Sequence, residues 1–184
     1  MRRSYVVALA LAIAIIVAAT IFFVYPRGPS MTVSIEPENV GQLNVGDTFT
    51  VNVTVENGVN IYAVQGDIRF DPRILNVTQV LEGAFLGSAG NTAFMSTLGQ
   101  TLNTTDPLSA RVFFVESKTG TSLPDASGSG VLATITFQVI SNGASKLQVF
   151  PYPGGNVGVG TYFRRRDNTE VIPALQEGSY GGPP

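Results

Sequence analysis

The chain has 184 residues, a formal net charge of −2 at neutral pH, and no histidine, cysteine or tryptophan. Without histidine and cysteine it lacks the usual general base and thiol nucleophile, and it can form neither a disulfide framework nor a thiolate metal site. The basic residues are scattered, which argues against nucleic acid as a partner. We therefore expect a protein that is not an enzyme and that carries no metal ion or cofactor.

An uncharged apolar run extends from Tyr5 to Tyr25, soon after Arg2 and Arg3. A helix of about 20 such residues crosses a bilayer. The best candidate for signal-peptide cleavage, Val17-Ala18-Ala19, is followed by further apolar residues, which favours an anchor that is not cleaved.

Residues 1–26 are therefore predicted to form one N-terminal transmembrane helix, and residues 27–30 a short linker. The excess of positive charge before the apolar run predicts a cytoplasmic N-terminus and an extracellular domain tethered to the cell membrane. If the signal is cleaved instead, the domain is secreted.

Strands with alternating apolar and polar residues follow the linker. In Thr48–Glu56 the odd-numbered residues are apolar and the even-numbered ones polar, so one face packs on a core and the other meets water. Met31–Glu36 and Asn60–Phe70 alternate in a similar way. Asp71-Pro72 ends the latter strand, because proline cannot donate to a ladder. The pattern predicts an antiparallel sheet with one solvated face.

The second half of the chain carries further strand signals, at Ile74–Leu81, Arg111–Ser117, Val131–Ile140, Lys146–Phe150 and, more weakly, near Val157 and Val171. Glu82–Pro107 is less regular and is predicted to form long connections, and no segment after the anchor has a sustained helical period. Residues 178–184 are predicted to be a flexible tail. Many short strands at this spacing indicate one all-β domain over residues 31–177, an antiparallel β-sandwich or jelly roll.

Several motifs occur in an order that resembles the cohesin domain family. A Gly-Asp pair begins a strand, an aromatic-Asp-Pro sequence ends the next one, and a glycine precedes the following segment. The sequence SGSGVLATITFQV comes later. The matching residues are Gly46, Asp47, Phe70, Asp71, Pro72, Leu75, Gly83, Gly130, Leu132, Ala133, Ile135 and Phe137.

The resemblance implies a jelly-roll sandwich of about nine strands, related in fold to certain carbohydrate-binding modules. It also implies a non-catalytic role, since cohesins bind dockerin modules and so attach proteins to scaffolds or cell surfaces. The expected function is therefore attachment of a dockerin-type or other surface protein at the cell surface.

The partner-binding face of the family includes the outward side of the strand before the Asp-Pro stop. By this resemblance the candidate contact residues are Ala63, Gln65, Asp67 and Arg69, with Glu116 at the end of a middle strand. The alternative for Asp67 and Arg69 is ordinary solvated charge, and the alternative for Glu116 is an exposed side chain at a strand end.

Two other functions remain open on sequence grounds. Exposed aromatic rings can stack on sugars, and Tyr152 and Tyr162 are the glycan-binding candidates for a polysaccharide, unless they close the end of the sandwich. A surface fibre could instead assemble by strand exchange, with Met31–Glu36 as the donated strand.

Three Asn-x-Thr sequences fit the acceptor pattern for N-glycosylation. The acceptors would be Asn52, Asn76 and Asn103. Because Asn52 is expected to point outward from its strand, a glycan there would cover that face of the sheet.

Overall fold

The computed structural model describes residues 30–87, 91–101, 108–120, 124–155 and 158–182. Within these ranges the chain forms fourteen strands and one short helix. Met31–Pro184 forms one compact unit. The predicted transmembrane segment lies outside the described residues, and no helix within them is both long and apolar enough to span a membrane.

The first sheet contains five strands. Their order is β13 (Ala174–Leu175), β1 (Thr32–Glu36), β3 (Thr48–Ile61), β9 (Ala126–Val139) and β5 (Leu75–Glu82). Its centre is the antiparallel β3–β9 pair, in which Phe49 faces Phe137 and Val51 faces Ile135. The alternation predicted for Thr48–Glu56 is therefore confirmed, because its odd-numbered residues all lie in the core.

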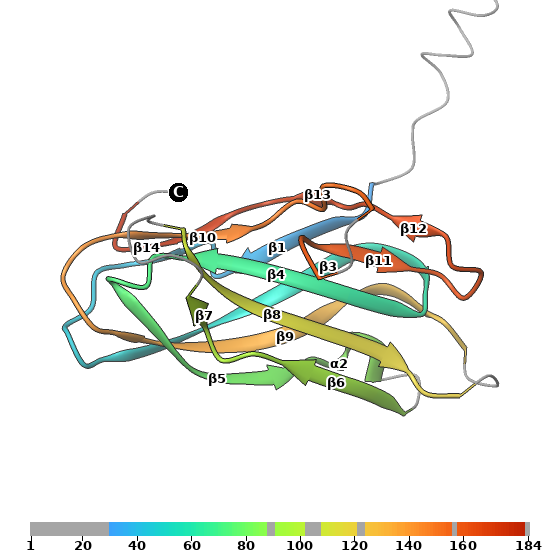
Figure 1. Cartoon of the computed structure of the whole chain (residues 1–184), viewed down its shortest axis with the longest axis horizontal. Coiled ribbons are helices and arrows are strands. Elements are labelled where there is room, and N and C mark those ends of the chain that lie inside the picture. Colours follow the sequence, from blue (N-terminus) through green and yellow to red (C-terminus); the bar gives the residue numbers. More distant parts are fainter. Residues whose placement is uncertain (1–29, 88–90, 102–107, 121–123, 156–157, 183–184) are drawn as a thin grey trace, which may run out of the picture. The chain divides into compact units, whose positions relative to one another are not determined.

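The second sheet is built around β4 (Ala63–Phe70). One path through it runs β12 (Glu170–Val171), β11 (Tyr162–Arg164), β4, β10 (Ser145–Val149), β14 (Gly178–Tyr180) and β2 (Asn39–Val40). The other edge of β4 pairs with β8 (Ala110–Lys118), which in turn pairs with β6 (Thr92–Ser96) and β7 (Gln100–Thr101). Figure 1 shows β11, β4, β8 and β6 following one another down the molecule.

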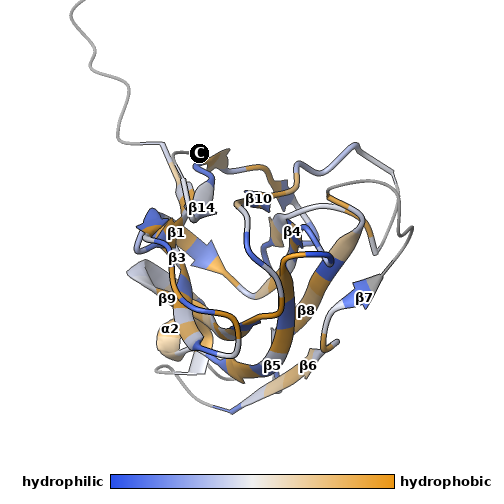
Figure 2. Ribbon diagram, turned by 90° about the vertical axis from the view of Figure 1, so that its left-hand side faces the viewer, coloured by the Kyte–Doolittle hydropathy of each residue, from blue (hydrophilic) through white to orange (hydrophobic). Residues whose placement is uncertain are grey.

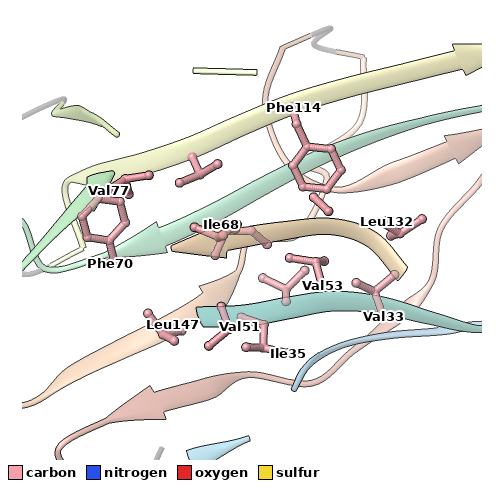
Figure 3. Close-up of a cluster of buried hydrophobic side chains, with 14 of the residues drawn as sticks. Val33, Ile35, Val51, Val53, Ile68, Phe70, Val77, Phe114, Leu132 and Leu147 are labelled. Carbon is pink, nitrogen blue, oxygen red and sulfur yellow. The ribbon is translucent and has the colours of Figure 1, made fainter. Parts of the chain in front are cut away.

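The core lies between the two sheets. In Figure 2, β1, β3 and β9 stand on one side, β4 and β8 stand on the other, and hydrophobic residues recur along these strands. Figure 3 shows the side chains that meet there: Val33, Ile35, Val51, Val53, Ile68, Phe70, Val77, Phe114, Leu132 and Leu147. Burial of these apolar surfaces is the main favourable term for folding, and it is achieved here without a disulfide.

The predicted all-β sandwich is confirmed, but its strands are not all antiparallel. β13 runs parallel to β1, and β14 runs parallel to β2. Both pairings join the two ends of the domain, one in each sheet. No local sequence pattern marks a pairing between segments so far apart in the chain.

The flexible tail predicted for residues 178–184 is wrong at its beginning. Gly178–Tyr180 is strand β14, and Tyr180 is fully buried with its ring 5.1 Å from that of Phe49. The Tyr180 hydroxyl donates to the carbonyl of Leu43 and accepts from Gln42 Nε2, both at 3.1 Å. One aromatic residue therefore holds a glycine-rich segment that composition alone suggested would be frayed.

The segment Glu82–Pro107 was expected to form only long connections, but its described part contains β6, β7 and the helix α2 (Ala84–Gly87). Two side chains of α2, Phe85 and Leu86, are buried against the core. Gly83 precedes the helix where the backbone passes β9 so closely that a Cβ atom would lie 2.1 Å from the carbonyl oxygen of Val131. A glycine is required there by close approach of the backbone.

Candidate partner-binding face

The outer face of the second sheet presents one row of side chains across four strands. The register pairs Tyr162 of β11 with Gln65 of β4, Gln65 with Val115 of β8, and Val115 with Met95 of β6. Directly paired residues of antiparallel strands point to the same side of a sheet. We call this surface, with its neighbours Ala63, Arg164, Phe113 and Thr97, the row face.

Two shallow hollows lie in the row face and share Val115. The first has a volume of about 220 Å³ and is lined by Ala63, Val64, Gln65, Val115, Tyr162 and Arg164. The second, of about 370 Å³, is lined by Met95, Ser96, Thr97, Phe113 and Val115. Met95 is 76% exposed. Exposed apolar hollows beside polar rims are typical of surfaces that bind another protein.

The chain segment that leads into β11 lies over the outer side of β4 at Gln65 and Asp67. Gln65 Nε2 donates to the carbonyl of Gly160 at 2.9 Å, and Gln65 Oε1 accepts from the Gly158 amide at 3.1 Å. The Gly160 amide donates to Asp67 Oδ2 at 3.1 Å. Gln65 and Asp67 do point outward as predicted, but they are 4% and 0% exposed because this segment lies over them.

Two arginines flank the carboxylate of Asp67. Arg69 Nε lies 3.5 Å and Arg111 Nη1 lies 3.7 Å from its carboxylate oxygens. Arg69 also stacks on the ring of Phe150, 3.3 Å from the centroid, and Arg111 Nη1 donates to the Gly158 carbonyl at 2.9 Å. The expectation of ordinary solvated charge for Asp67 is wrong, since a fully buried carboxylate is retained only when charges or hydrogen bonds compensate it.

Glu116 does not belong to the row face. Residues of β8 alternate, and Glu116 points with Val112 and Phe114 toward the interior, where it is 0% exposed. The alternative of an exposed side chain at a strand end is therefore also wrong. Burial, followed by the nearby Glu82 carboxylate, raises the pKa of Glu116 to about 8.

The structure brings the glycan-binding candidates together but does not expose both. The rings of Tyr152 and Tyr162 lie 4.3 Å apart between centroids, and Tyr162 is only 5% exposed. The Tyr152 hydroxyl donates to Glu170 Oε1 at 3.3 Å. The two rings cover each other on the outer face of the second sheet, which leaves Tyr162 little surface for a sugar ring.

The glycosylation candidates differ in access. Asn76 is exposed on the edge strand β5. Asn52 points outward as predicted, but it is half-buried and its Oδ1 accepts from the Thr134 hydroxyl at 2.9 Å. Asn103 lies outside the described residues.

Sequence reasoning named Ala63 and Gln65 of the row face as partner contacts and Tyr162 as a glycan-binding residue, and it missed the contribution of β8 and β6. One signal was present: β8 is apolar on both sides, with Val112 and Phe114 inward and Phe113 and Val115 outward. A strand in an antiparallel sheet needs only one apolar face for the core. The second apolar face therefore marked a surface available for contact.

Comparison with known proteins agrees with the fold. Residues 32–154 match the sequence model of the Cohesin domain. A non-cellulosomal cohesin from the archaeon Archaeoglobus fulgidus is 17% identical, with a TM-score of 0.57 and coverage of 83% of this chain and 90% of that one. A type II cohesin domain from the cellulosome of Acetivibrio cellulolyticus is 16% identical, with a TM-score of 0.60 and coverage of 83% and 96%.

A third similar structure is a complex rather than a free domain. It is a type I cohesin–dockerin complex from Clostridium thermocellum, 18% identical, with a TM-score of 0.59 and coverage of 83% of this chain and 98% of that one. A search of curated protein sequences finds no match. From the family match, which spans most of the sandwich, we conclude that this chain belongs to the cohesin domain family.

Proposed function

We propose that this protein is a non-catalytic binding module that captures a dockerin-type protein through the row face. The observation that carries the proposal is the row Tyr162, Gln65, Val115 and Met95, with an apolar hollow on each side of Val115. A helix of a partner laid across the four strands would remove these apolar surfaces from water, and such burial drives association. Cohesins of similar fold are found in complexes with dockerins, which supports a partner of that type.

The proposed contact is largely apolar, although polar and charged residues of β4 were among the candidates from the resemblance. The side-chain amide of Gln65 already donates to Gly160 and accepts from Gly158. Asp67 lies under the same segment. The side chains left for a partner are therefore the exposed Met95 and the half-buried Ala63, Phe113, Val115 and Arg164.

The test is direct binding of purified dockerin modules to the immobilised full chain, compared with the variant Met95→Asp. We expect binding to the unchanged chain that weakens at least about tenfold in the variant, because a charge would enter an apolar hollow. Leu81→Asp is the matched control, since Leu81 is also exposed but lies on β5 of the other sheet. Equal affinity for both variants would contradict the proposed face.

A fibre built by strand exchange is disfavoured by the position of β1. This strand lies between β3 and β13, and its residues Val33 and Ile35 are 0% and 1% exposed. Donating it to a neighbour would break two ladders and open the core. Glycan binding is likewise not favoured, because Tyr162 is covered by Tyr152.

The cellular setting that we propose is the outside of the cell membrane. The apolar run from Tyr5 to Tyr25 would anchor the domain, and the arginines before it would keep the N-terminus inside. Protease treatment of intact cells tests this arrangement: we expect loss of the sandwich domain with retention of the N-terminal segment in the membrane fraction. A protected domain would contradict it.

A further inference from the structure

The interior face of β8 ends in two charged side chains that the proposed binding reaction does not use. Glu116 and Lys118 are 0% and 1% exposed. Lys118 Nζ donates to the carbonyl of Leu86 in α2 at 3.1 Å, and it forms no ion pair with Glu116 among the described residues. The buried lysine therefore ties β8 to the helix, and the buried glutamate needs another explanation.

Neither carboxylate oxygen of Glu116 accepts a hydrogen bond from a donor in the described part of the chain. The carboxyl group beside it is that of the exposed Glu82, at the end of β5. Glu82 bonds to Thr92, the β6 residue paired with Lys118, and it is one of the groups that raise the pKa of Glu116. Two carboxylates are both acceptors, so their contact is favourable only when one of them carries a proton and donates it to the other.

Among the described residues packed around Glu116, no other charged group takes over this role. α2, β6 and β9 contain no charged residue, and β5 contributes only Glu82. The β4 residue paired with Glu116 is Val64, while Asp67 and Arg69 of that strand point to the outer face. Titration of Glu116 is therefore controlled by burial, Glu82 and Lys118.

The carboxyl pair lies where three strands meet. Glu116 is directly paired with Phe94 of β6, and the Thr92 hydroxyl at the start of β6 donates to Glu82 Oε1. β6 is held on one side only, by β8, and its outward residue Met95 forms a wall of the second hollow. A change in the protonation of Glu116 and Glu82 would therefore act on β6, at the edge of the row face.

We propose that a proton shared between Glu116 and Glu82 acts as a latch that holds β6 on β8, and that loss of this proton releases β6. Ionisation of the pair would place two adjacent carboxylates, one of them fully buried, against one buried lysine. Repulsion and desolvation both disfavour that state. The release of β6 is a property of the domain alone; its effect on partner capture rests on the proposed function.

The direction of the pH dependence follows from the pKa of Glu116. Its pKa in the folded domain is about 8, against an ordinary value of 4.5. Folding therefore favours the protonated group, so its stabilising effect is complete below pH 4.5 and is lost as the pH rises to about 8. Above that pH the carboxylate is charged in both states and the loss is complete.

The test is amide hydrogen exchange of the full chain from pH 6 to pH 9.5, corrected for the intrinsic pH dependence of exchange. We expect protection of the β6 amides Thr92–Ser96 to fall at least about tenfold between pH 6 and pH 8 and to change little above pH 8, while β3 stays protected. Glu116→Gln keeps a donor but cannot ionise, so its β6 protection should stay constant. Glu56→Gln, at an exposed position of β3, is the control and should behave as the unchanged chain.

A second variant keeps the proposal testable if Glu116→Gln does not fold. In Glu82→Gln the second carboxylate is gone and the amide can donate to an ionised Glu116, so β6 should lose less protection over the same pH range than in the unchanged chain. Constant β6 protection in the unchanged chain, or the same release in Glu116→Gln, would overturn the latch. Protection restored at pH 9 by Ca²⁺ would also overturn it, since the pair would then hold a cation. Hydrogen exchange is measured without a partner. Its result therefore tests the latch even if no dockerin binds the protein.

Discussion

The two outer faces of the sandwich differ in the side chains that they present to solvent. On the first sheet, side chains of neighbouring strands bond to each other: the hydroxyls of Ser34 and Thr54 lie 2.9 Å apart, and the Thr134 hydroxyl donates to Asn52 Oδ1 at 2.9 Å. On the second sheet, the row face exposes Met95 and shapes two apolar hollows around Val115. The first face is polar and satisfied, and the second is apolar and open.

The difference teaches which face has something to gain from a partner. A polar group that is already bonded within the protein adds little when a partner replaces its water, because one set of hydrogen bonds is exchanged for another. An apolar hollow gains free energy from every part of its surface that is covered. The comparison therefore favours the second sheet as the binding surface that we propose.

The largest expected effect is on dockerin binding, and it is tested by placing an arginine on each of the two faces. Val115→Arg should weaken dockerin binding by about 2–4 kcal/mol, roughly 30- to 1,000-fold in Kd, because Val115 is common to both hollows. Thr136→Arg, on the polar face, should leave the Kd unchanged. Calorimetric titration of both variants checks this, and equal losses would show that binding is not confined to one face.

A smaller effect concerns the joint between β4 and β8 beneath the row face. A Cβ atom at Gly66 would lie 2.2 Å from the ring of Phe114, which is fully buried and cannot move freely. Gly66→Ala should therefore lower the free energy of unfolding by about 2–3 kcal/mol. Gly41→Ala is the control, because a Cβ there meets nothing within 4 Å. Urea denaturation compares them, and similar midpoints would contradict the close packing.

An intermediate effect on stability is expected at Asp67, which lies beneath the segment that leads into β11. Asp67→Asn keeps an acceptor for the Gly160 amide but removes the charge between Arg69 and Arg111. We expect a loss of about 1–2 kcal/mol in thermal unfolding, since a bond to a charged group is worth more than a neutral one. The exposed pair Asp125–Arg166, at 2.8 Å, is the control. Asp125→Asn should cost less than about 1 kcal/mol, and a larger cost there would reverse the assignment.

The smallest effect belongs to the polar face. The Thr50 and Thr136 hydroxyls lie 3.3 Å apart on the exposed side of β3 and β9. A double-mutant cycle with Thr50→Val and Thr136→Val should give a coupling of less than about 0.5 kcal/mol and no change in binding. A coupling above about 1 kcal/mol would mean that this face is a structural network rather than a solvated surface.

Much of the fold could be predicted because burial leaves a period of two in the sequence. The alternation in β3 and the apolar residues Val33, Ile35, Ile68 and Phe70 placed their side chains in the core correctly. Alternation gave no placement for Glu116, which was a candidate only through the resemblance, since its strand is apolar on both sides and the pattern does not say which side is the interior. Local alternation predicts that two faces exist, and only the packing of one sheet on the other assigns them.

The candidate site was predicted in part for a related reason. Ala63 and Gln65 were placed on the correct face, but nothing in the sequence near β4 shows that Gly158 and Gly160 would lie over Gln65 and Asp67. Glycines carry no side chain that signals a contact, and their backbone groups bond wherever the chain leads them. Which part of a sheet is covered therefore depends on the path that the rest of the chain takes in the folded protein.

By itself, the sequence determined a single all-β domain, the core residues of its two longest alternating strands and the order of motifs that resembles a cohesin, because each of these depends on residues close together in the chain. Tertiary structure alone decided that Tyr180 closes the sandwich, that Glu116 is buried beside the exposed Glu82, and that Met95 joins Val115 in an open row. Each of these contacts joins segments that are distant in the chain, so it exists only after the sheets have formed.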